Sequence, residues 1–161
     1  MKALILAAGL GTRLKPWTLH HPKALAEVNG KSLLQRTIEY LQRAGIDDVI
    51  VNVHHFADQI IQSLQDNSGW GSRYEISDER HLLMDTGGAI MQAAAEGYLT
   101  ATDQFLIVNA DILTDLPLNE LMGEQVGSMN LATLAVSDRP SSRRLLFEKQ
   151  TGLLGGWENT A

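Results

Sequence analysis

Short apolar runs recur along this chain, and the stretches between them carry apolar residues at every third or fourth position. Residues Lys2 to Ala7 show no alternation of polar and apolar positions, which is typical of a strand buried on both faces of a parallel sheet. The runs Asp48 to Val53 and Gln104 to Asn109 predict two further strands, and Arg73 to Ser77 predicts a weaker one. The chain is therefore expected to build its core around short strands.

Helices are predicted in the intervals between these strands. One should begin at Ser32, since Ser32 and Gln35 have the spacing of a capping box, and it should end at Gly45. Others are expected over Ala57 to Leu64, from Gly87 to about Glu96, and over Pro117 to Gly123. Strands that alternate with helices imply right-handed crossovers. The predicted fold class is therefore α/β, with three layers and a doubly wound, mostly parallel, Rossmann-like sheet.

The carboxyl-terminal part of the chain carries a different pattern. Met129 to Val136 is strand-like by its mixture of Leu, Thr and Val, and the stretches Arg144 to Glu148 and Gly152 to Trp157 predict a hairpin. No internal repeat, Pro-rich linker or shift in composition marks a boundary, and 161 residues suffice for one domain with a real core. We therefore expect a single domain over residues 1–161.

Charge and composition limit the classes of partner that this protein can bind. A net charge of −6 gives no general attraction to nucleic acid or to an anionic membrane, so we expect neither as a partner and expect any nucleotide to meet a local cationic site. No apolar run approaches the roughly 18 residues that span a bilayer, and Met1-Lys2 leads directly into a predicted core strand rather than a cleavable signal. The absence of cysteine excludes disulfides, thiolate metal sites and cysteine nucleophiles, and it fits the cytoplasmic location that we expect.

A long loop, from about Ala8 to Lys31, follows the first strand, and a loop of this length in a compact domain is usually functional. Its glycines admit three explanations that spacing separates. The dinucleotide fingerprint requires a third glycine or alanine where Leu14 stands, and an acid closing the second strand, which ends instead in Asn52-Val53. A Walker P-loop requires a glycine where Leu25 stands, so we interpret Gly30-Lys31-Ser32 as a turn and a helix cap.

The third explanation fits the residues in detail. The segment Ala8-Gly9-Leu10-Gly11-Thr12-Arg13-Leu14-Lys15-Pro16 is followed, ten residues after Arg13, by Lys23 in Pro22-Lys23-Ala24-Leu25. These two halves resemble the signature of the sugar-nucleotide pyrophosphorylases, nucleotidyltransferases that join a nucleoside triphosphate (NTP) to a sugar 1-phosphate. The resemblance continues through Asp85-Thr86-Gly87-Gly88-Ala89 and Val108-Asn109-Ala110-Asp111, in register over essentially the whole chain. Within the family it is nearest to short bacterial members of the mannose-1-phosphate guanylyltransferase or N-acetylmuramate-1-phosphate uridylyltransferase type.

The chemistry of that reaction explains the residue types in the loop. A sugar phosphate oxygen attacks the α-phosphorus and pyrophosphate departs, so catalysis is mainly positioning and neutralisation of charge, and no general base is required. Gly9 and Gly11 would let backbone N–H groups approach the triphosphate, Arg13 can grip the leaving pyrophosphate with two donors, and Lys23 can supply a compact charge at the α-phosphate. The resemblance assigns the same catalytic roles to Arg13 and Lys23, and it places Thr12 in the same nucleotide-binding loop. Solvated surface cations are the alternative.

Asp111 follows a predicted strand at the sheet end where open α/β proteins bind ligands. A carboxylate that faces a triphosphate would be repelled unless Mg²⁺ bridged the two groups. The resemblance implies that Mg²⁺ is the cofactor and that Asp111 is one of its ligands, whereas an aspartate that caps a turn is the alternative. A second magnesium aspartate, which the family carries in its carboxyl-terminal part, has no match in this sequence.

A base pocket is the remaining expectation. Gly87 and Gly88 open a predicted helix whose N-terminal N–H groups would meet the base or the ribose, with Asp85 beside them. A flat floor for the base would come from Leu6, Ala7 and Ala8. This assignment rests on the family resemblance more than on physics, and close packing of helix against strand is the competing explanation for the two glycines.

The resemblance makes the substrates an NTP and a sugar 1-phosphate, whose base and sugar the sequence does not specify. Family members ordinarily continue beyond the position of Ala161, so we expect a truncated or partly observed product. If the chain is the whole molecule, sugar binding should be weak or a second subunit must cover the exposed sheet, which makes a homo-oligomer one alternative. The competing hypotheses are an NTP-binding regulatory or degenerate domain without turnover, and cytidylyl transfer to a non-sugar phosphate.

Overall fold

The structure is a computed structural model that describes residues 1–82, 84–100 and 104–160, and it divides the chain into two compact units, Met1–Glu120 and Leu121–Ala161. The expectation of one domain over residues 1–161 stays a prediction. All of the expected nucleotide-site residues belong to the first unit.

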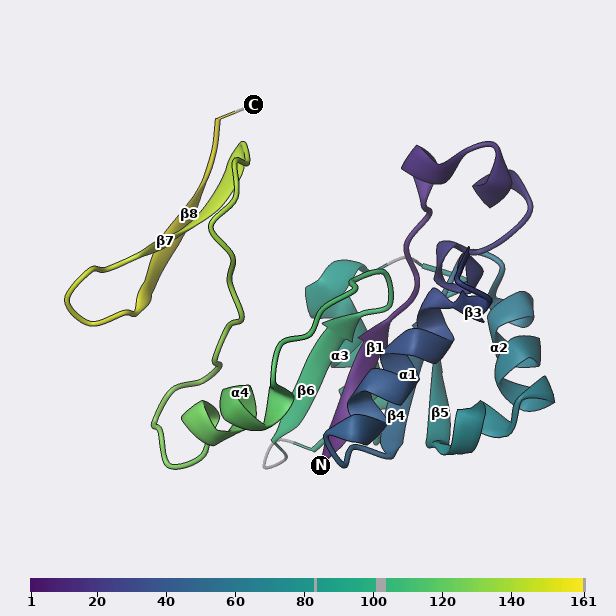
Figure 1. Ribbon diagram of the computed structural model, residues 1–161, viewed down its shortest axis with the longest axis horizontal. Coiled ribbons are helices and arrows are strands. Elements are labelled where there is room, and N and C mark those ends of the chain that lie inside the picture. The colour runs from purple at the N-terminus through teal and green to yellow at the C-terminus, as the bar shows by residue number, and fades with distance from the viewer. Residues whose placement is uncertain (83, 101–103, 161) are drawn as a thin grey trace. The chain divides into compact units, whose positions relative to one another are not determined.

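A parallel sheet forms the centre of the first unit (Figure 1). Within the described residues its strands are β1 (Lys2–Leu6), β4 (Asp48–Val53), β5 (Arg73–Asp78) and β6 (Phe105–Asn109), in the spatial order β5-β4-β1-β6. Each of these strands was predicted, to within one residue at either end. The order reverses beside β1, because the chain moves outward from β1 to β5 and then returns to place β6 on the other side of β1.

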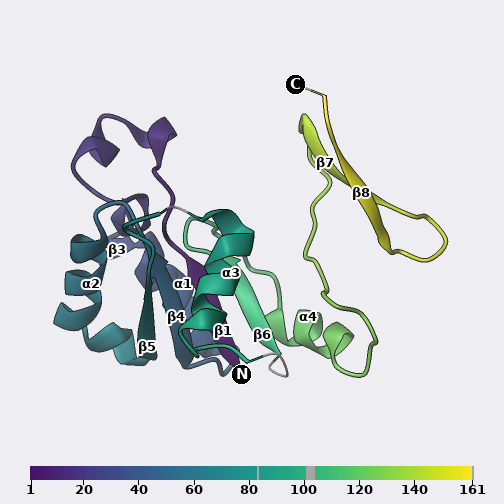
Figure 2. The ribbon, with the colours of Figure 1, turned by 180° about the vertical axis from the view of Figure 1, so that it is seen from behind.

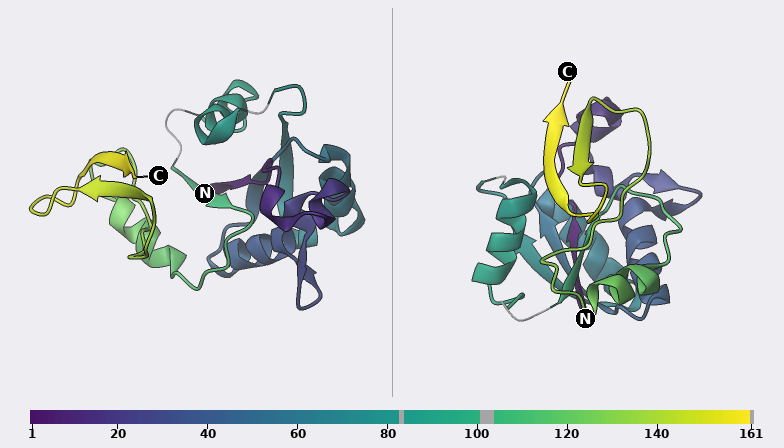
Figure 3. Two further views of the ribbon diagram at one scale, coloured as in Figure 1. Left: turned by 90° about the horizontal axis from the view of Figure 1, so that it is seen from above. Right: turned by 90° about the vertical axis from the view of Figure 1, so that its left-hand side faces the viewer.

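Helices cover both faces of this sheet, which confirms the predicted α/β, doubly wound fold class. Helix α1 (Leu33–Arg43) lies in front of the sheet in Figure 1, and α3 (Asp85–Ala95) lies in front of it when the molecule is seen from behind in Figure 2. Seen from above in Figure 3 (left), the sheet separates α1 from α3. Helix α2 (Ala57–Asp66) connects β4 to β5 and is followed by the 3-10 helix η4 (Ser68–Gly71).

Strand register decides which side chains meet which helix. Leu4 pairs in register with Ile50, and both belong to a buried cluster with Ala93 and Leu99, so this face of the sheet packs against α3. Alternate residues point to the opposite face, where Ile5 and Val51 are fully buried. Fully buried side chains of the amphipathic helices α1 and α2 complete the core, and these are Leu34, Ile38, Leu41, Ile60 and Leu64.

The start of α1 follows the predicted capping chemistry. Ser32 is the N-cap, and its hydroxyl accepts a hydrogen bond from the backbone N–H of Gln35 at 3.1 Å. Gly45, at φ 77°, follows the helix in the left-handed conformation that commonly ends helices. Lys31 pairs with the Glu39 carboxylate, and Gly30 has a φ of 73°. The interpretation of Gly30-Lys31-Ser32 as a turn and helix cap is therefore confirmed.

The loop after β1 is long, as expected, and has local order. It contains the 3-10 helices η1 (Thr12–Leu14), η2 (Trp17–Leu19) and η3 (Lys23–Leu25), and ends in a small antiparallel pair of β2 (Glu27–Val28) and β3 (Lys31–Ser32). Among the described residues, every helix falls short of the length and apolar character that a bilayer crossing requires.

In the second unit, the predicted hairpin is confirmed and another prediction is wrong. After α4 (Leu118–Gln125), which begins in the first unit, β7 (Arg143–Phe147) pairs antiparallel with β8 (Leu154–Asn159). Met129 to Val136 does not form a strand. The side chains of Met129 and Leu131 are fully exposed and this stretch joins no ladder in the described residues, so its β-propensity lacks the packing partner that a strand needs.

Candidate active site

The switch in strand order places two chain segments at one edge of the sheet. Leu6, the last residue of β1, pairs in register with Asn109, the last residue of β6, and the Ala110 N–H donates to the Leu6 carbonyl at 3.0 Å. The loop that starts at Ala7 and the segment that carries Asp111 therefore leave the sheet side by side, at the crevice where open α/β sheets bind ligands.

Lys23 and Asp111 meet at this crevice, although they stand 88 residues apart in the sequence. The Lys23 ammonium donates to Asp111 Oδ2, and both side chains are partly exposed. Ala24, next to Lys23, is buried, which anchors η3. Ala110 is also buried, and its carbonyl accepts from the Thr37 hydroxyl of α1 at 3.3 Å. Two anchored backbones thus hold a cation and an anion at the mouth of the site.

Gly11 connects the two halves of the glycine and lysine motif. Its φ is 62°, a left-handed conformation that glycine adopts without strain, and an added Cβ would stand 2.9 Å from Lys23 Cβ and 2.9 Å from Thr18 Cγ2. The Gly11 carbonyl accepts from the hydroxyl of the buried Thr18 and from the Leu14 N–H, each at 2.9 Å. Gly11 is therefore required by the packing of the loop, independently of any ligand.

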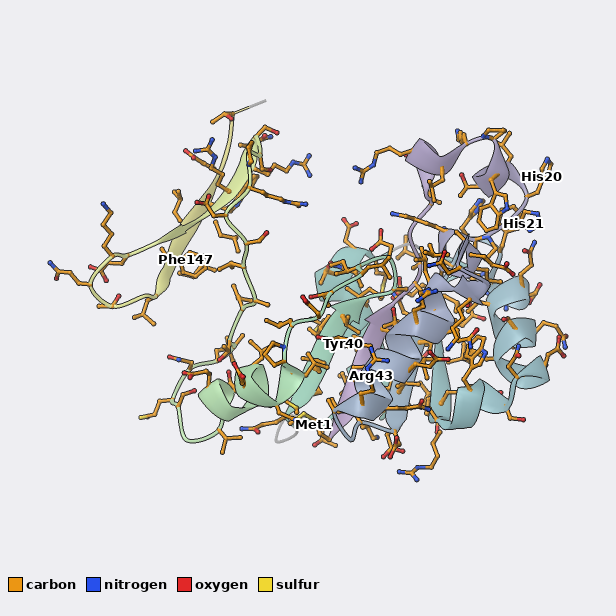
Figure 4. The ribbon with its side chains drawn as sticks, in the orientation of Figure 1. Met1, His20, His21, Tyr40, Arg43 and Phe147 are labelled. Atoms are coloured by element: carbon orange, nitrogen blue, oxygen red, sulfur yellow. The ribbon has the colours of Figure 1, made fainter. Side chains whose placement is uncertain are left out.

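Arg13 and Thr12 lie on η1 and are exposed. Within the residues that the structure describes, no hydrogen bond or ion pair engages the Arg13 side chain. A guanidinium without an internal partner is available to an anionic ligand. His20 and His21 project from the same loop (Figure 4), where His21 stacks on Trp17 with 4.8 Å between ring centroids.

The three other glycines expected at the site differ in what surrounds them. A Cβ on Gly9 or on Gly87 would meet nothing within 4 Å, so either backbone is open to a close approach by a ligand. A Cβ on Gly88 would collide with the side chain of Met84, the N-cap of the same helix, so a glycine is needed there by packing within the first turn of α3 rather than by contact with a strand. Asp85 is exposed and has a φ of 48°, a conformation that aspartate tolerates better than most residues.

A buried polar network, which we did not predict, underlies the predicted floor of the base pocket. Ala7 and Ala8 are buried, and their N–H groups donate to Asn52 Oδ1 at 2.6 and 3.2 Å. Asn52 Nδ2 donates to Glu79 Oε1 at 3.0 Å, and both of these side chains are buried. The sequence did contain one signal, because Asn52 is a polar residue inside the apolar run of β4.

The acidic residues decide how a metal ion could be held. Among the described residues, no group of three or more His, Asp or Glu side chains could hold a metal ion. Asp111 contributes one carboxylate, which pairs with Lys23. Mg²⁺ commonly binds through one or two carboxylates together with substrate phosphates. The donor set therefore fits a magnesium ion shared with a bound nucleotide, and it does not fit a metal site made by the protein alone.

Known proteins resemble this chain in sequence and fold. The N-acetylmuramate alpha-1-phosphate uridylyltransferase of Caulobacter vibrioides is 45% identical over 95 residues, which cover 58% of this chain and 39% of that protein. The mannose-1-phosphate guanylyltransferase catalytic subunit beta of Xenopus tropicalis is 36% identical over 124 residues, which cover 76% of this chain and 34% of that protein. This chain thus spans less than half the length of these curated relatives.

A solved structure extends the likeness to the fold. The crystal structure of HddC from Yersinia pseudotuberculosis complexed with GMP-PN superposes with a TM-score of 0.71 at 25% identity, covering 99% of this chain and 73% of that chain. The nucleotidyl transferase family model matches residues 2–144. On the strength of that match, the chain belongs to the nucleotidyl transferase family.

Proposed function

We propose that this chain provides the catalytic site of an enzyme that transfers a nucleotidyl group from an NTP to a sugar 1-phosphate and releases pyrophosphate. The observation that carries the proposal is the meeting of Lys23 and Asp111 beside Gly11, at the carboxyl ends of the neighbouring strands β1 and β6. The curated relatives, a uridylyltransferase and a guanylyltransferase that act on sugar 1-phosphates, support this reaction class.

The positively charged residues of the site would each neutralise a different phosphate group. The reaction joins an oxygen of the sugar phosphate to the α-phosphorus and breaks the bond from the α-phosphorus to pyrophosphate. Negative charge must therefore be neutralised at the α-phosphate and on the departing pyrophosphate. Lys23 would leave Asp111 and neutralise the α-phosphate. Arg13, a planar fork of donors, would bind the departing pyrophosphate. Backbone N–H groups in the loop that contains Gly9, Gly11 and Thr12 would line the triphosphate.

The nucleoside end would lie on the other side of the crevice. Leu6, Ala7 and Ala8 would form the floor under the base, and the open backbone at Gly87, with Asp85 and Gly88 beside it, would face the base or the ribose. The free N–H groups at the start of α3 favour an acceptor on the ligand.

Asp111 would bind Mg²⁺ together with the phosphates of the nucleotide. When bound, Mg²⁺ would neutralise phosphate charge and orient the triphosphate. Since the described residues place no further carboxylate beside Asp111 in a group that could hold a metal by itself, we propose that the nucleotide phosphates supply ligands when Mg²⁺ binds here. We also propose a cytoplasmic location for the protein, in keeping with the absence of cysteine.

The test is pyrophosphate release from each of the four common NTPs with Mg²⁺, first with a panel of sugar 1-phosphates and then with phosphocholine as the acceptor. NTP binding is measured alongside by calorimetry. The proposal predicts release with at least one pair of substrates. Binding without release from any pair would favour a regulatory or degenerate domain, and release with phosphocholine alone would favour cytidylyl transfer to a non-sugar phosphate. The absence of both NTP binding and pyrophosphate release would overturn the proposal.

A further inference from the structure

Glu79 is a buried acid that the proposed reaction does not use. It follows β5, is 4% exposed, and forms no salt bridge within the described residues. A buried carboxylate is costly unless hydrogen bonds compensate for the lost water. Here both oxygens accept hydrogen bonds, Oε1 from Asn52 Nδ2 at 3.0 Å and Oε2 from the Met84 N–H at 3.4 Å.

The backbone of Glu79 is also held at both of its polar groups. Its N–H donates to the Val53 carbonyl at 2.8 Å, and its carbonyl accepts from the Leu82 N–H at 3.0 Å. His54 Nδ1 lies 2.7 Å from the same carbonyl. Glu79 is therefore fixed between the end of β4 and the segment that leads to α3, and its carboxylate has little freedom to move.

Asn52 transmits this fixed position to the loop after β1. Its Oδ1 is the acceptor for the N–H groups of Ala7 and Ala8, which are buried and cannot turn to water. The Glu79 carboxylate accepts from Asn52 Nδ2, which holds the amide with Oδ1 toward the loop. One continuous chain of hydrogen bonds thus runs from Ala7 and Ala8, through two side chains, to Met84.

The two ends of this series of hydrogen bonds adjoin the two halves of the proposed nucleotide site. Ala8 precedes Gly9, where the phosphate-binding loop begins, and Met84 is the N-cap of α3, the helix that carries Gly87. We propose that Asn52 and Glu79 are positioning residues that hold the phosphate side and the base side of the site in register, so that an NTP can contact both. This inference rests on the proposed function.

Substitutions that reverse the direction of the hydrogen bond between Asn52 and Glu79 distinguish a positioning role from simple packing. In Glu79→Gln, one oxygen and one NH₂ group replace two oxygens, so either Asn52 Nδ2 or the Met84 N–H loses its acceptor. In Asn52→Asp, an oxygen instead of a donor faces the Glu79 carboxylate. The double variant Asn52→Asp/Glu79→Gln restores every partner, because the new amide donates to the new carboxylate and still accepts from Met84. It also keeps the net charge.

The experiment measures the Kd of the NTP that binds the unmodified chain most tightly, together with amide exchange at Ala7 and Ala8 without nucleotide. Glu79→Gln should raise the Kd roughly tenfold, which corresponds to about 1.4 kcal/mol. It should also speed amide exchange at Ala7 and Ala8, to which Glu79 is linked only through Asn52. The double variant should return both readouts to within about threefold of the unmodified values. Glu75 is an exposed residue of β5, the strand that precedes Glu79, and Glu75→Gln makes the same change of charge. This control variant should alter neither the Kd nor the exchange.

The outcomes distinguish this inference from the function on which it rests. If the unmodified chain binds none of the four NTPs, the proposed function is overturned and this inference falls with it. If it binds one and Glu79→Gln binds it equally tightly, only the inference is overturned. Loss of binding that the double variant fails to rescue would likewise contradict a positioning role.

Discussion

The Lys23 side chain packs against the backbone of Gly11 so closely that a Cβ on Gly11 would stand 2.9 Å from Lys23 Cβ. The loop glycine and the loop lysine are therefore one structural unit, and the lysine is held at the crevice before any nucleotide arrives. These contacts explain why a glycine is needed at this position.

Gly11→Ala should destabilise the chain and misplace Lys23. A φ of 62° and two contacts at 2.9 Å, to Lys23 and Thr18, leave no room for the added methyl group without a shift of the loop. We expect a loss of about 1–3 kcal/mol in the free energy of unfolding, measured by urea denaturation. Gly9→Ala is the matched control, because its Cβ would meet nothing within 4 Å. Equal stability of the two variants would contradict the packing role of Gly11.

Gly87→Ala and Gly88→Ala should fail in different ways. The Gly88 Cβ would collide with Met84, so we expect Gly88→Ala to lose about 1–3 kcal/mol of stability in thermal unfolding. The Gly87 Cβ would meet open space, and alanine favours a helix, so Gly87→Ala should fold at least as stably as the parent.

Gly87→Ala should nevertheless bind NTP more weakly, by roughly tenfold in calorimetry, or about 1.4 kcal/mol. The expected cause is the methyl group, which would block the approach of the base or the ribose to the backbone. Unchanged affinity would show that Gly87 lies outside the nucleotide site.

Ser77→Ala should not destabilise the chain. Ser77 pairs in register with Asn52, and its hydroxyl is buried without a hydrogen-bond partner among the described residues. Removing an unsatisfied buried hydroxyl recovers its desolvation penalty, so we expect stability to rise by about 1 kcal/mol in thermal unfolding. A loss of more than about 1 kcal/mol would mean that the hydroxyl has a partner in solution.

The Glu39 carboxyl should titrate below its ordinary pKa of 4.5. The hydrogen bond from Lys31 lowers the pKa most, against the opposing effect of burial, and Gln35 lowers it further. Folding then gains stability above the ordinary pKa, and this gain is lost as the pH falls through the folded-state pKa. In an NMR titration, Lys31→Met should move the Glu39 pKa back toward 4.5. The stability involved should stay below about 1 kcal/mol, since the pair is partly exposed. An unchanged pKa would contradict the pairing.

The sequence predicted the sheet well because its signals are local. Unbroken apolar runs identify buried strands, and the Ser32 cap and Gly45 mark both ends of α1. Met129 to Val136 shows the limit of such signals. Its residue types favour a strand, but a strand forms only with a partner for its hydrogen bonds and side chains.

Long-range relationships at the site were the harder part. The sequence indicated Lys23 and Asp111 separately, but it did not predict their ion pair. This pair joins residues 88 positions apart and depends on the return of β6 beside β1. The network of Asn52 and Glu79 was not predicted because its members come from separate segments of the chain and none of them matches a motif. Only the fold shows that they support the loop.

Pyrophosphate release by Lys23→Met, measured beside that of Lys31→Met, tests whether Lys23 takes part in nucleotidyl transfer. Both changes remove one lysine charge, but Lys23 pairs with Asp111 at the crevice, whereas Lys31 pairs with Glu39 on α1. Neither variant should lose more than about 1 kcal/mol of stability, because both pairs are partly exposed. We predict that Lys23→Met loses at least about 100-fold in kcat, a typical cost of removing one transition-state contact, while Lys31→Met retains parental turnover. Turnover by Lys23→Met equal to that of Lys31→Met would contradict this prediction.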